Sequence, residues 1–112
     1  MEMIVETLPN GVTKASLVGR LDIDGAAKID VPFNALARSP YGLAVDLSGV
    51  TFIASMGIRT LMLCARTMAA DGRRLALVSP QPNVEKALRA TGVDEVMEIF
   101  TSLDTAAEAL KG

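Results

Sequence analysis

The chain has 112 residues, of which half are hydrophobic, and its 11 basic and 13 acidic side chains give a formal net charge of −2. A chain of this length fits one domain, residues 1–112, and its nearly balanced charge without a basic run argues against disorder and against direct nucleic-acid binding. The apolar stretches fall short of the ~20 residues that a membrane span needs, and the N-terminus lacks the basic-then-apolar pattern of a signal peptide. We therefore expect a cytoplasmic protein without membrane insertion.

The sequence contains one cysteine, Cys64, and no histidine. One cysteine cannot form an internal disulfide, and a chain without histidine lacks the commonest general base and the commonest metal ligand. Cys64 lies in an apolar helical stretch with no second thiol to activate it or to share a metal, so we interpret it as a packing residue. We expect no enzymatic activity, no cofactor and no metal.

Two β-rich stretches, residues 1–7 and 12–19, open the sequence, and Pro9 to Gly11 between them favour a hairpin turn. Residues 26–39 then follow helical spacing, and Pro32 must sit early in that helix or kink it. The apolar run at residues 42–50 is typical of a buried central strand that ends in a turn.

The second half of the chain alternates helices with strands. Apolar residues from Met56 to Asp71 trace one helical face, and Gly72 follows as a terminator. The remaining predicted elements are a strand at 73–79, a helix at 80–92, a strand at 96–100 and a helix at 102–110. Because the opening hairpin is antiparallel and the later helical crossovers favour parallel pairing, we predict an α/β fold. Its mixed β-sheet has four to five strands, and about four helices pack largely on one face.

Two small residues, Ser55 and Gly57, stand where the apolar stretch at 51–53 turns into the long helix. A serine at this junction is typical of an N-cap, whose hydroxyl accepts the N–H of Gly57 or Ile58. Glycine in a first helical turn costs up to ~1 kcal/mol relative to alanine, so we expect another backbone to approach Gly57 closely. Because a helix N-terminus also favours anions, a phosphate on Ser55 is compatible with this position.

Three motifs in order resemble the STAS domain, the module shared by sulfate transporter tails and bacterial anti-sigma factor antagonists. They are "GRLD" from Gly19, "DLSGV" from Asp46, and "ASMG" from Ala54, and the likeness extends over nearly the whole chain. The resemblance implies a signalling protein that regulates transcription through an anti-sigma factor or related serine kinase. It also implies that this partner phosphorylates Ser55, so that the protein is a switch and not an enzyme.

The last motif departs from the family pattern, in which Asp precedes the phosphorylated serine and Ser or Thr follows it. This chain has Ala54 and Met56 at those positions, and Arg59 where a small residue is usual. Loss of the aspartate removes a group that orients the hydroxyl, but also a charge that repels a phosphate. Arg59 lies one helical turn after Ser55, where it either contacts such a phosphate or is a solvated surface arginine.

We predict that the partner binds next to Ser55. Met56, Thr60 and Leu63 fall on a helical face that carries apolar surface outward, and Gly57 and Arg59 lie beside it.

Two aspartates are expected to end strands near the same edge of the sheet. We assign Asp22 to partner contact and Asp46 to a structural role near the switch. The alternative hypothesis is a STAS scaffold or transporter-associated subunit that is not phosphorylated. Ala54 and Met56 favour this alternative.

Overall fold

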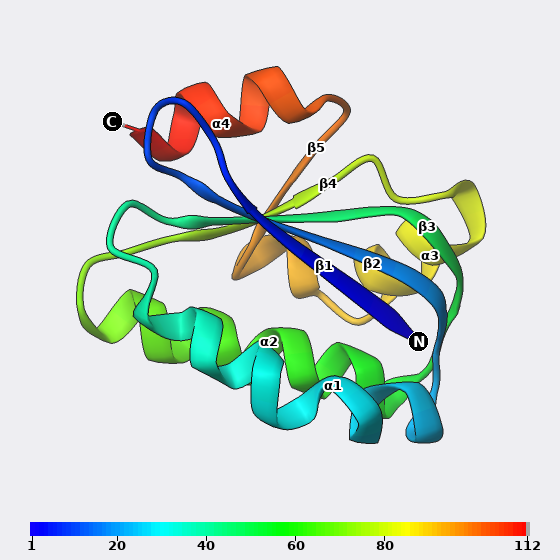
Figure 1. Cartoon of the computed structure of the whole chain (residues 1–112). Coiled ribbons are helices and arrows are strands. Elements are labelled where there is room, and N and C mark those ends of the chain that lie inside the picture. Colours follow the sequence, from blue (N-terminus) through cyan, green and yellow to red (C-terminus); the bar gives the residue numbers. More distant parts are fainter. Residues whose placement is uncertain (112) are drawn as a thin grey trace.

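A five-stranded mixed sheet crosses the molecule and carries helices on both faces (Figure 1). The structure is a computed structural model and describes residues 1–111. The strands are β1 (Glu2–Thr7), β2 (Thr13–Leu21), β3 (Leu43–Ile53), β4 (Leu75–Val78) and β5 (Glu98–Phe100). The helices are α1 (Ile23–Ala35), α2 (Ser55–Ala70), α3 (Pro82–Ala90) and α4 (Leu103–Lys111), with single 3₁₀ turns at Leu36–Arg38 and Val93–Glu95.

The strands lie in the order β1-β2-β3-β4-β5, so each strand pairs with its neighbour in sequence. β1 and β2 form the antiparallel hairpin, and the other three pairs are parallel. Each parallel pair is joined by a crossover through a helix, as parallel pairing requires. The predicted mixed sheet is confirmed.

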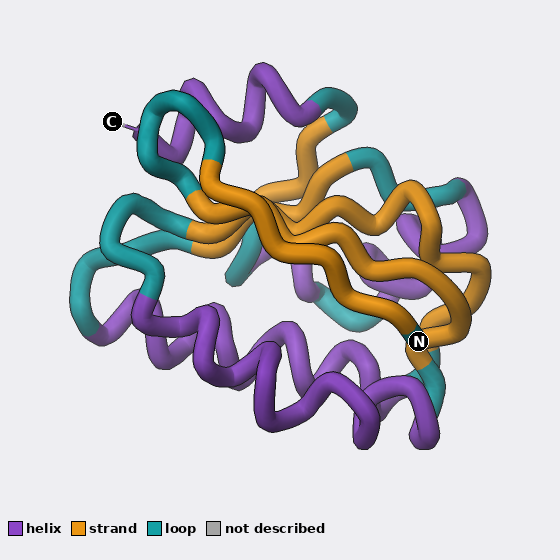
Figure 2. Tube along the Cα trace, viewed as in Figure 1, coloured by secondary structure: helices purple, strands orange, loops and turns teal. Residues whose placement is uncertain are grey.

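Three helices, α1, α2 and α3, cover one face of the sheet, and α4 packs alone on the other (Figures 1 and 2). The larger core lies under the three helices and includes the fully buried Leu17, Phe33 and Leu61. The smaller core under α4 includes Phe100 and Ala106. The prediction that the helices lie largely on one face is therefore confirmed, with α4 as the exception. Within residues 1–111, none of the helices is long and apolar enough to span a membrane.

At the start of α1 and at the end of β3, the structure differs from the predicted boundary by three residues. Helix α1 begins at Ile23 instead of residue 26. Pro32 lies inside α1 and not early in it, so of the two predicted alternatives the kink stays a prediction. Strand β3 continues to Ile53 instead of turning at residue 50. Its turn-like residues form a β-bulge, because the pairing of β2 with β3 advances from Ser16 with Asp46 to Val18 with Gly49.

Candidate functional site

The ends of β2 and β3 place the starts of α1 and α2 side by side. Leu21 and Ile53, the last residues of these two strands, are partners in the parallel ladder. Each helix begins two residues later, at Ile23 and at Ser55. The Ala54 N–H donates to the Leu21 carbonyl at 3.0 Å and ties the two junctions together. In open α/β sheets, ligands bind outside the carboxyl ends of the strands, which is the edge that Ser55 occupies.

Two glycines let the helices start this close to the end of β2. A Cβ on Gly57 would collide with the carbonyl oxygen and side chain of Leu21, and a Cβ on Gly25 would collide with the carbonyl oxygen of Arg20. Both collisions involve backbone atoms of a strand, which have little freedom to move. The expected close approach of another backbone to Gly57 is therefore confirmed. Gly25 allows the same close approach between α1 and the end of β2.

Asp22 caps the N-terminus of α1. One carboxylate oxygen accepts the Gly25 N–H at 2.9 Å, and the other accepts the Arg20 Nε–H at 3.4 Å. The hydrogen bond from Gly25 and the nearby Arg20 guanidinium lower the pKa of Asp22, so this carboxylate is ionised at neutral pH. The aspartate thus has a structural role, and its contact with a partner stays a prediction.

Ser55 is not the N-cap of α2, and this prediction is wrong. The cap position falls on Ala54, whose φ of −118° and ψ of 174° are extended, and Ser55 is the first residue inside the helix. The helix therefore begins one residue earlier than predicted, because both polar groups of the Ala54 backbone are hydrogen-bonded. The Ala54 N–H donates to the Leu21 carbonyl, and the Ala54 carbonyl accepts the Ile58 N–H at 3.1 Å. Among the described residues, no side chain caps this end of α2. Ser55 is exposed.

A groove of about 400 Å³ runs between α1 and α2, and its lining includes Met56, the residue that follows Ser55. Three exposed apolar side chains line it: Ile23 is 67% exposed, Met56 41% and Leu63 42%. Arg59 of α2 and Asp30 of α1 add one charge of each sign to the lining. Apolar side chains left this exposed on neighbouring helices are typical of a surface that binds a partner.

The family model of the STAS domain matches residues 7–106 of the chain. The chain belongs to the STAS domain family. It is 25% identical over 104 residues to the anti-sigma-F factor antagonist RsfB of Mycobacterium tuberculosis, which covers 92% of this chain and 84% of that protein. A crystal structure of an anti-sigma factor antagonist from Mycobacterium paratuberculosis superposes with a TM-score of 0.89 at 27% identity, covering 99% of this chain and 94% of that one.

An anti-sigma-factor antagonist (STAS) domain protein from Planctomyces limnophilus is similar to the same degree. Its TM-score is 0.89 at 25% identity, and the match covers 98% of each chain. The fold and the family that the sequence motifs imply are therefore confirmed.

Two residues predicted for the docking surface of this STAS domain are buried. Thr60 is 5% exposed, and its hydroxyl donates to the Met56 carbonyl at 3.0 Å. Gly57 is buried against the end of β2. Thr60 does lie in the lining of the groove with Met56 and Leu63, but it is buried instead of outward because this side of α2 packs towards α1. Sequence reasoning missed Ile23, although an isoleucine directly after the capping Asp22 is a recognisable signal of exposed apolar surface.

Asp46 lies far from the switch edge of the STAS domain. It stands inside β3, seven residues before Ile53, which corresponds to about 23 Å of strand. One oxygen accepts the Ser48 N–H at 2.9 Å and supports the β-bulge, and Lys14 lies 3.9 Å from the other. The prediction that Asp46 ends a strand near Ser55 is wrong.

Cys64 is buried, with 1% of its surface exposed. Burial raises the pKa of the thiol to about 11, so the side chain is protonated at neutral pH. Its interpretation as a packing residue is confirmed.

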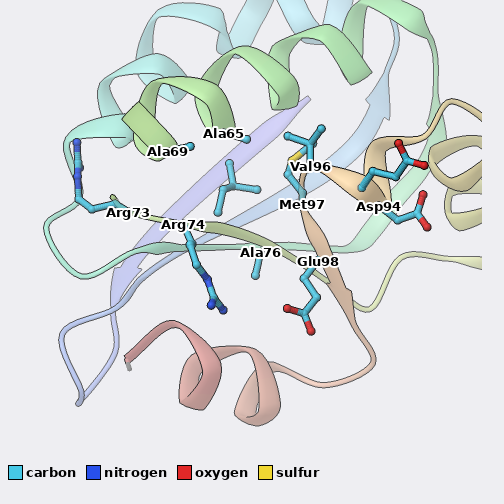
Figure 3. Close-up of a pocket in the computed structure, with 11 residues that line it drawn as sticks. Ala65, Ala69, Arg73, Arg74, Ala76, Asp94, Val96, Met97 and Glu98 are labelled. Atoms are coloured by element: carbon cyan, nitrogen blue, oxygen red, sulfur yellow. The ribbon is translucent and has the colours of Figure 1, made fainter. Parts of the chain in front are cut away.

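A second hollow, of about 410 Å³, lies between the C-terminal half of α2 and β5 (Figure 3). Alanines such as Ala65 and Ala69 leave space there, and Arg74 and Glu98 stand at its border. Ala69 is fourteen residues along α2 from Ser55, about 21 Å. This hollow is thus separate from the switch end of the STAS domain and contains no predicted site residue.

The uncapped start of α2 gives a testable prediction. We expect Ala54→Asp to raise the free energy of unfolding by about 1 kcal/mol, because an aspartate at an extended cap position accepts an N–H that no side chain now accepts. Urea unfolding of the two proteins measures the difference. Ala54→Leu is the matched control, since it fills the same position without an acceptor. An equal gain from both variants would contradict the assignment of Ala54 as the cap.

Proposed function

We propose that this STAS domain is a bacterial anti-sigma factor antagonist that binds an anti-sigma factor or related serine kinase, and that phosphorylation of Ser55 releases it. The observation that carries the proposal is an exposed serine at the motif position, in the first turn of α2 and beside an apolar groove. The names of the 25% and 27% identical relatives support the same partner class. The proposed place of action is the cytoplasm.

Docking relies on the groove between α1 and α2. Ile23, Met56 and Leu63 each have apolar area left to bury, and full burial of such a side chain is worth about 1.5–3 kcal/mol. Arg59 and Asp30 belong to the polar rim, where they orient the partner more than they add affinity. The first turns of α2 are therefore the centre of the proposed interface.

A phosphate on Ser55 acts through charge. It adds about 1.5–2 negative charges beside the groove, and removal of such a charge from water under a docked partner costs several kcal/mol, against about 1.4 kcal/mol for each tenfold change in affinity. Because Ser55 lies in the first turn of α2, the phosphate also meets the positive end of the helix dipole. Release of the partner therefore requires no unfolding.

The three departures from the family motif fit this mechanism. Because Ala54 has no polar side chain, the free N–H groups at the start of α2 lack a side-chain acceptor. A phosphate on Ser55 can accept hydrogen bonds from them. Arg59 lies four residues after Ser55, and its guanidinium supplies a second favourable contact in the modified protein. Met56, 41% exposed, adds apolar surface where the family usually has a hydroxyl.

Ala54 and Met56 also favour one alternative, a STAS scaffold or transporter-associated subunit in which Ser55 is never modified. Ala54 lacks the carboxylate of the usual kinase target, and Met56 would then be a permanent contact. Such a scaffold would bind its partner through the same groove. The alternative differs from the proposal only in whether charge at Ser55 changes binding.

Incubation with the purified partner kinase and ATP tests the proposal. We expect mass spectrometry to find one phosphate, on the peptide that contains Ser55, and Ser55→Ala to remain unmodified. The control is Ser48→Ala, which removes another exposed hydroxyl on β3 and should leave phosphorylation unchanged. Phosphate on a different residue, with Ser55 untouched, would contradict the proposal.

A further inference from the structure

Met56 is the most accessible of the six methionines in the chain. It lies in the first turn of α2 with 41% of its surface exposed, whereas Met68 and Met97 are 0% and 1% exposed. The remaining three are half-buried against the main core: Met1, Met3 and Met62. Met56 is therefore the methionine that a dissolved reagent reaches most readily.

The thioether of an accessible methionine reacts with peroxides. Its sulfur attacks one oxygen of hydrogen peroxide, the O–O bond breaks, and the sulfur keeps that oxygen as a sulfoxide while the peroxide is reduced to water. The sulfur loses two electrons, and no other reactant is needed. Cys64 does not compete for the oxidant, because it is 1% exposed and burial raises the pKa of its thiol to about 11.

Met56 contributes apolar surface to the groove between α1 and α2. Ile23 and Leu63 line the same groove, so its exposed surface there is largely apolar. A sulfoxide would add a strongly polar oxygen to it, and a docked partner would have to remove water from that oxygen at a cost in free energy. The Thr60 hydroxyl also lines the groove, but it already donates to the Met56 carbonyl at 3.0 Å.

We propose that Met56 is a modification site: a peroxide oxidises it to the sulfoxide, which weakens binding of the partner in the groove. The effect on binding rests on the proposed use of this groove, and it does not depend on phosphorylation of Ser55. The change is reversible, because a methionine sulfoxide reductase removes the oxygen as water while two thiols are oxidised to a disulfide. The same surface then responds to charge at Ser55 and to oxidation at Met56.

Oxidation of Met56 should leave the fold intact. Met56 belongs to neither of the two core clusters, whereas Met68 is part of the main core, where an added oxygen would be buried. We therefore expect the circular dichroism spectrum of the protein oxidised at Met56 to match that of the untreated protein. Loss of the helical signal would mean that weaker binding comes from unfolding and would contradict the proposal.

Brief treatment of the full chain with hydrogen peroxide, followed by peptide mass spectrometry, tests the site. We expect Met56 to gain one oxygen faster than every other methionine, and at least about fivefold faster than the buried Met68 and Met97. Faster oxidation at another methionine would overturn the assignment to Met56.

Isothermal titration calorimetry with the purified anti-sigma factor tests the effect on docking. Peroxide should weaken binding by the wild-type chain at least about tenfold, and a methionine sulfoxide reductase with dithiothreitol should restore it. Met56→Leu keeps an apolar side chain without a thioether, so its affinity should be the same before and after treatment. Met62→Leu is the matched control, because it removes a half-buried thioether of the same helix and should leave the loss of affinity unchanged.

The outcomes separate this modification from the proposed function. An untreated chain that does not bind the anti-sigma factor would overturn the proposed function and, with it, the effect of oxidation on docking. Binding by the untreated chain that is equally tight after Met56 is oxidised would overturn only the role of the sulfoxide. A Met56→Leu variant that loses as much affinity on treatment as the wild type would also overturn it.

Discussion

Gly25→Ala should lower the free energy of unfolding by about 3 kcal/mol, the upper part of the usual range for overpacking. The added Cβ would overlap the carbonyl oxygen of Arg20, and neither α1 nor β2 can move without losing contacts in the main core. Helix α1 would have to shift away from the end of β2, and with it Ile23 on one side of the groove. Urea denaturation followed by circular dichroism measures the loss.

Gly72→Ala is the control for this experiment. It makes the same substitution at a glycine with a φ of +73° and no heavy atom within 4 Å of the new Cβ. Only the backbone strain of a left-handed alanine, about 1–2 kcal/mol, remains at that position. Equal losses from Gly25→Ala and Gly72→Ala would mean that the close approach of α1 to β2 does not hold the helix start in place.

Ser55→Asp should weaken binding of the anti-sigma factor at least about tenfold, whereas Ser55→Ala should change it less than about twofold. Only the aspartate puts a negative charge at the end of the groove. Neither variant should lower stability by more than about 0.5 kcal/mol, because Ser55 is exposed and is not the cap of α2. The aspartate lies near the positive end of the helix dipole and is favourable there. Isothermal titration calorimetry gives both affinities.

Met56→Lys separates loss of docking from charge at the switch. It places a positive charge on an apolar residue of the groove and should impair binding whether or not Ser55 is ever phosphorylated. Equal affinity of Ser55→Asp and Ser55→Ala, together with weak binding by Met56→Lys, would favour the scaffold. The groove would then remain the contact surface without phosphate control.

The fold could be predicted because its periodic patterns are long and consistent. The long helix and the hairpin are local features, and local spacing predicts them well. The wrong boundaries of β3 and α1 occur where tertiary contacts, and not local spacing, determine where the element begins or ends. Ser48 and Gly49 favour a turn, but pairing with β2 carries the strand on as a bulge, and the start of α1 depends on Asp22 as its cap.

The candidate site was predictable only in part. The position of Ser55 followed from the motif, but which residue is the cap depends on the hydrogen bond from Ala54 to Leu21, a partner 33 residues away in the chain. Helical spacing likewise placed Thr60 on an outward face because it does not show where α1 packs. The groove needs side chains from both helices, so Ile23 became evident only in three dimensions.

The affinity of Ser55-phosphorylated protein for the purified anti-sigma factor tests the central claim most directly. Phosphoserine introduced at position 55 during translation gives a uniform sample, and the unmodified chain is its reference. We predict a dissociation constant at least about 100-fold higher for the phosphorylated protein, since two negative charges would enter an apolar interface. Equal dissociation constants for the two proteins would contradict the claim that Ser55 is the switch.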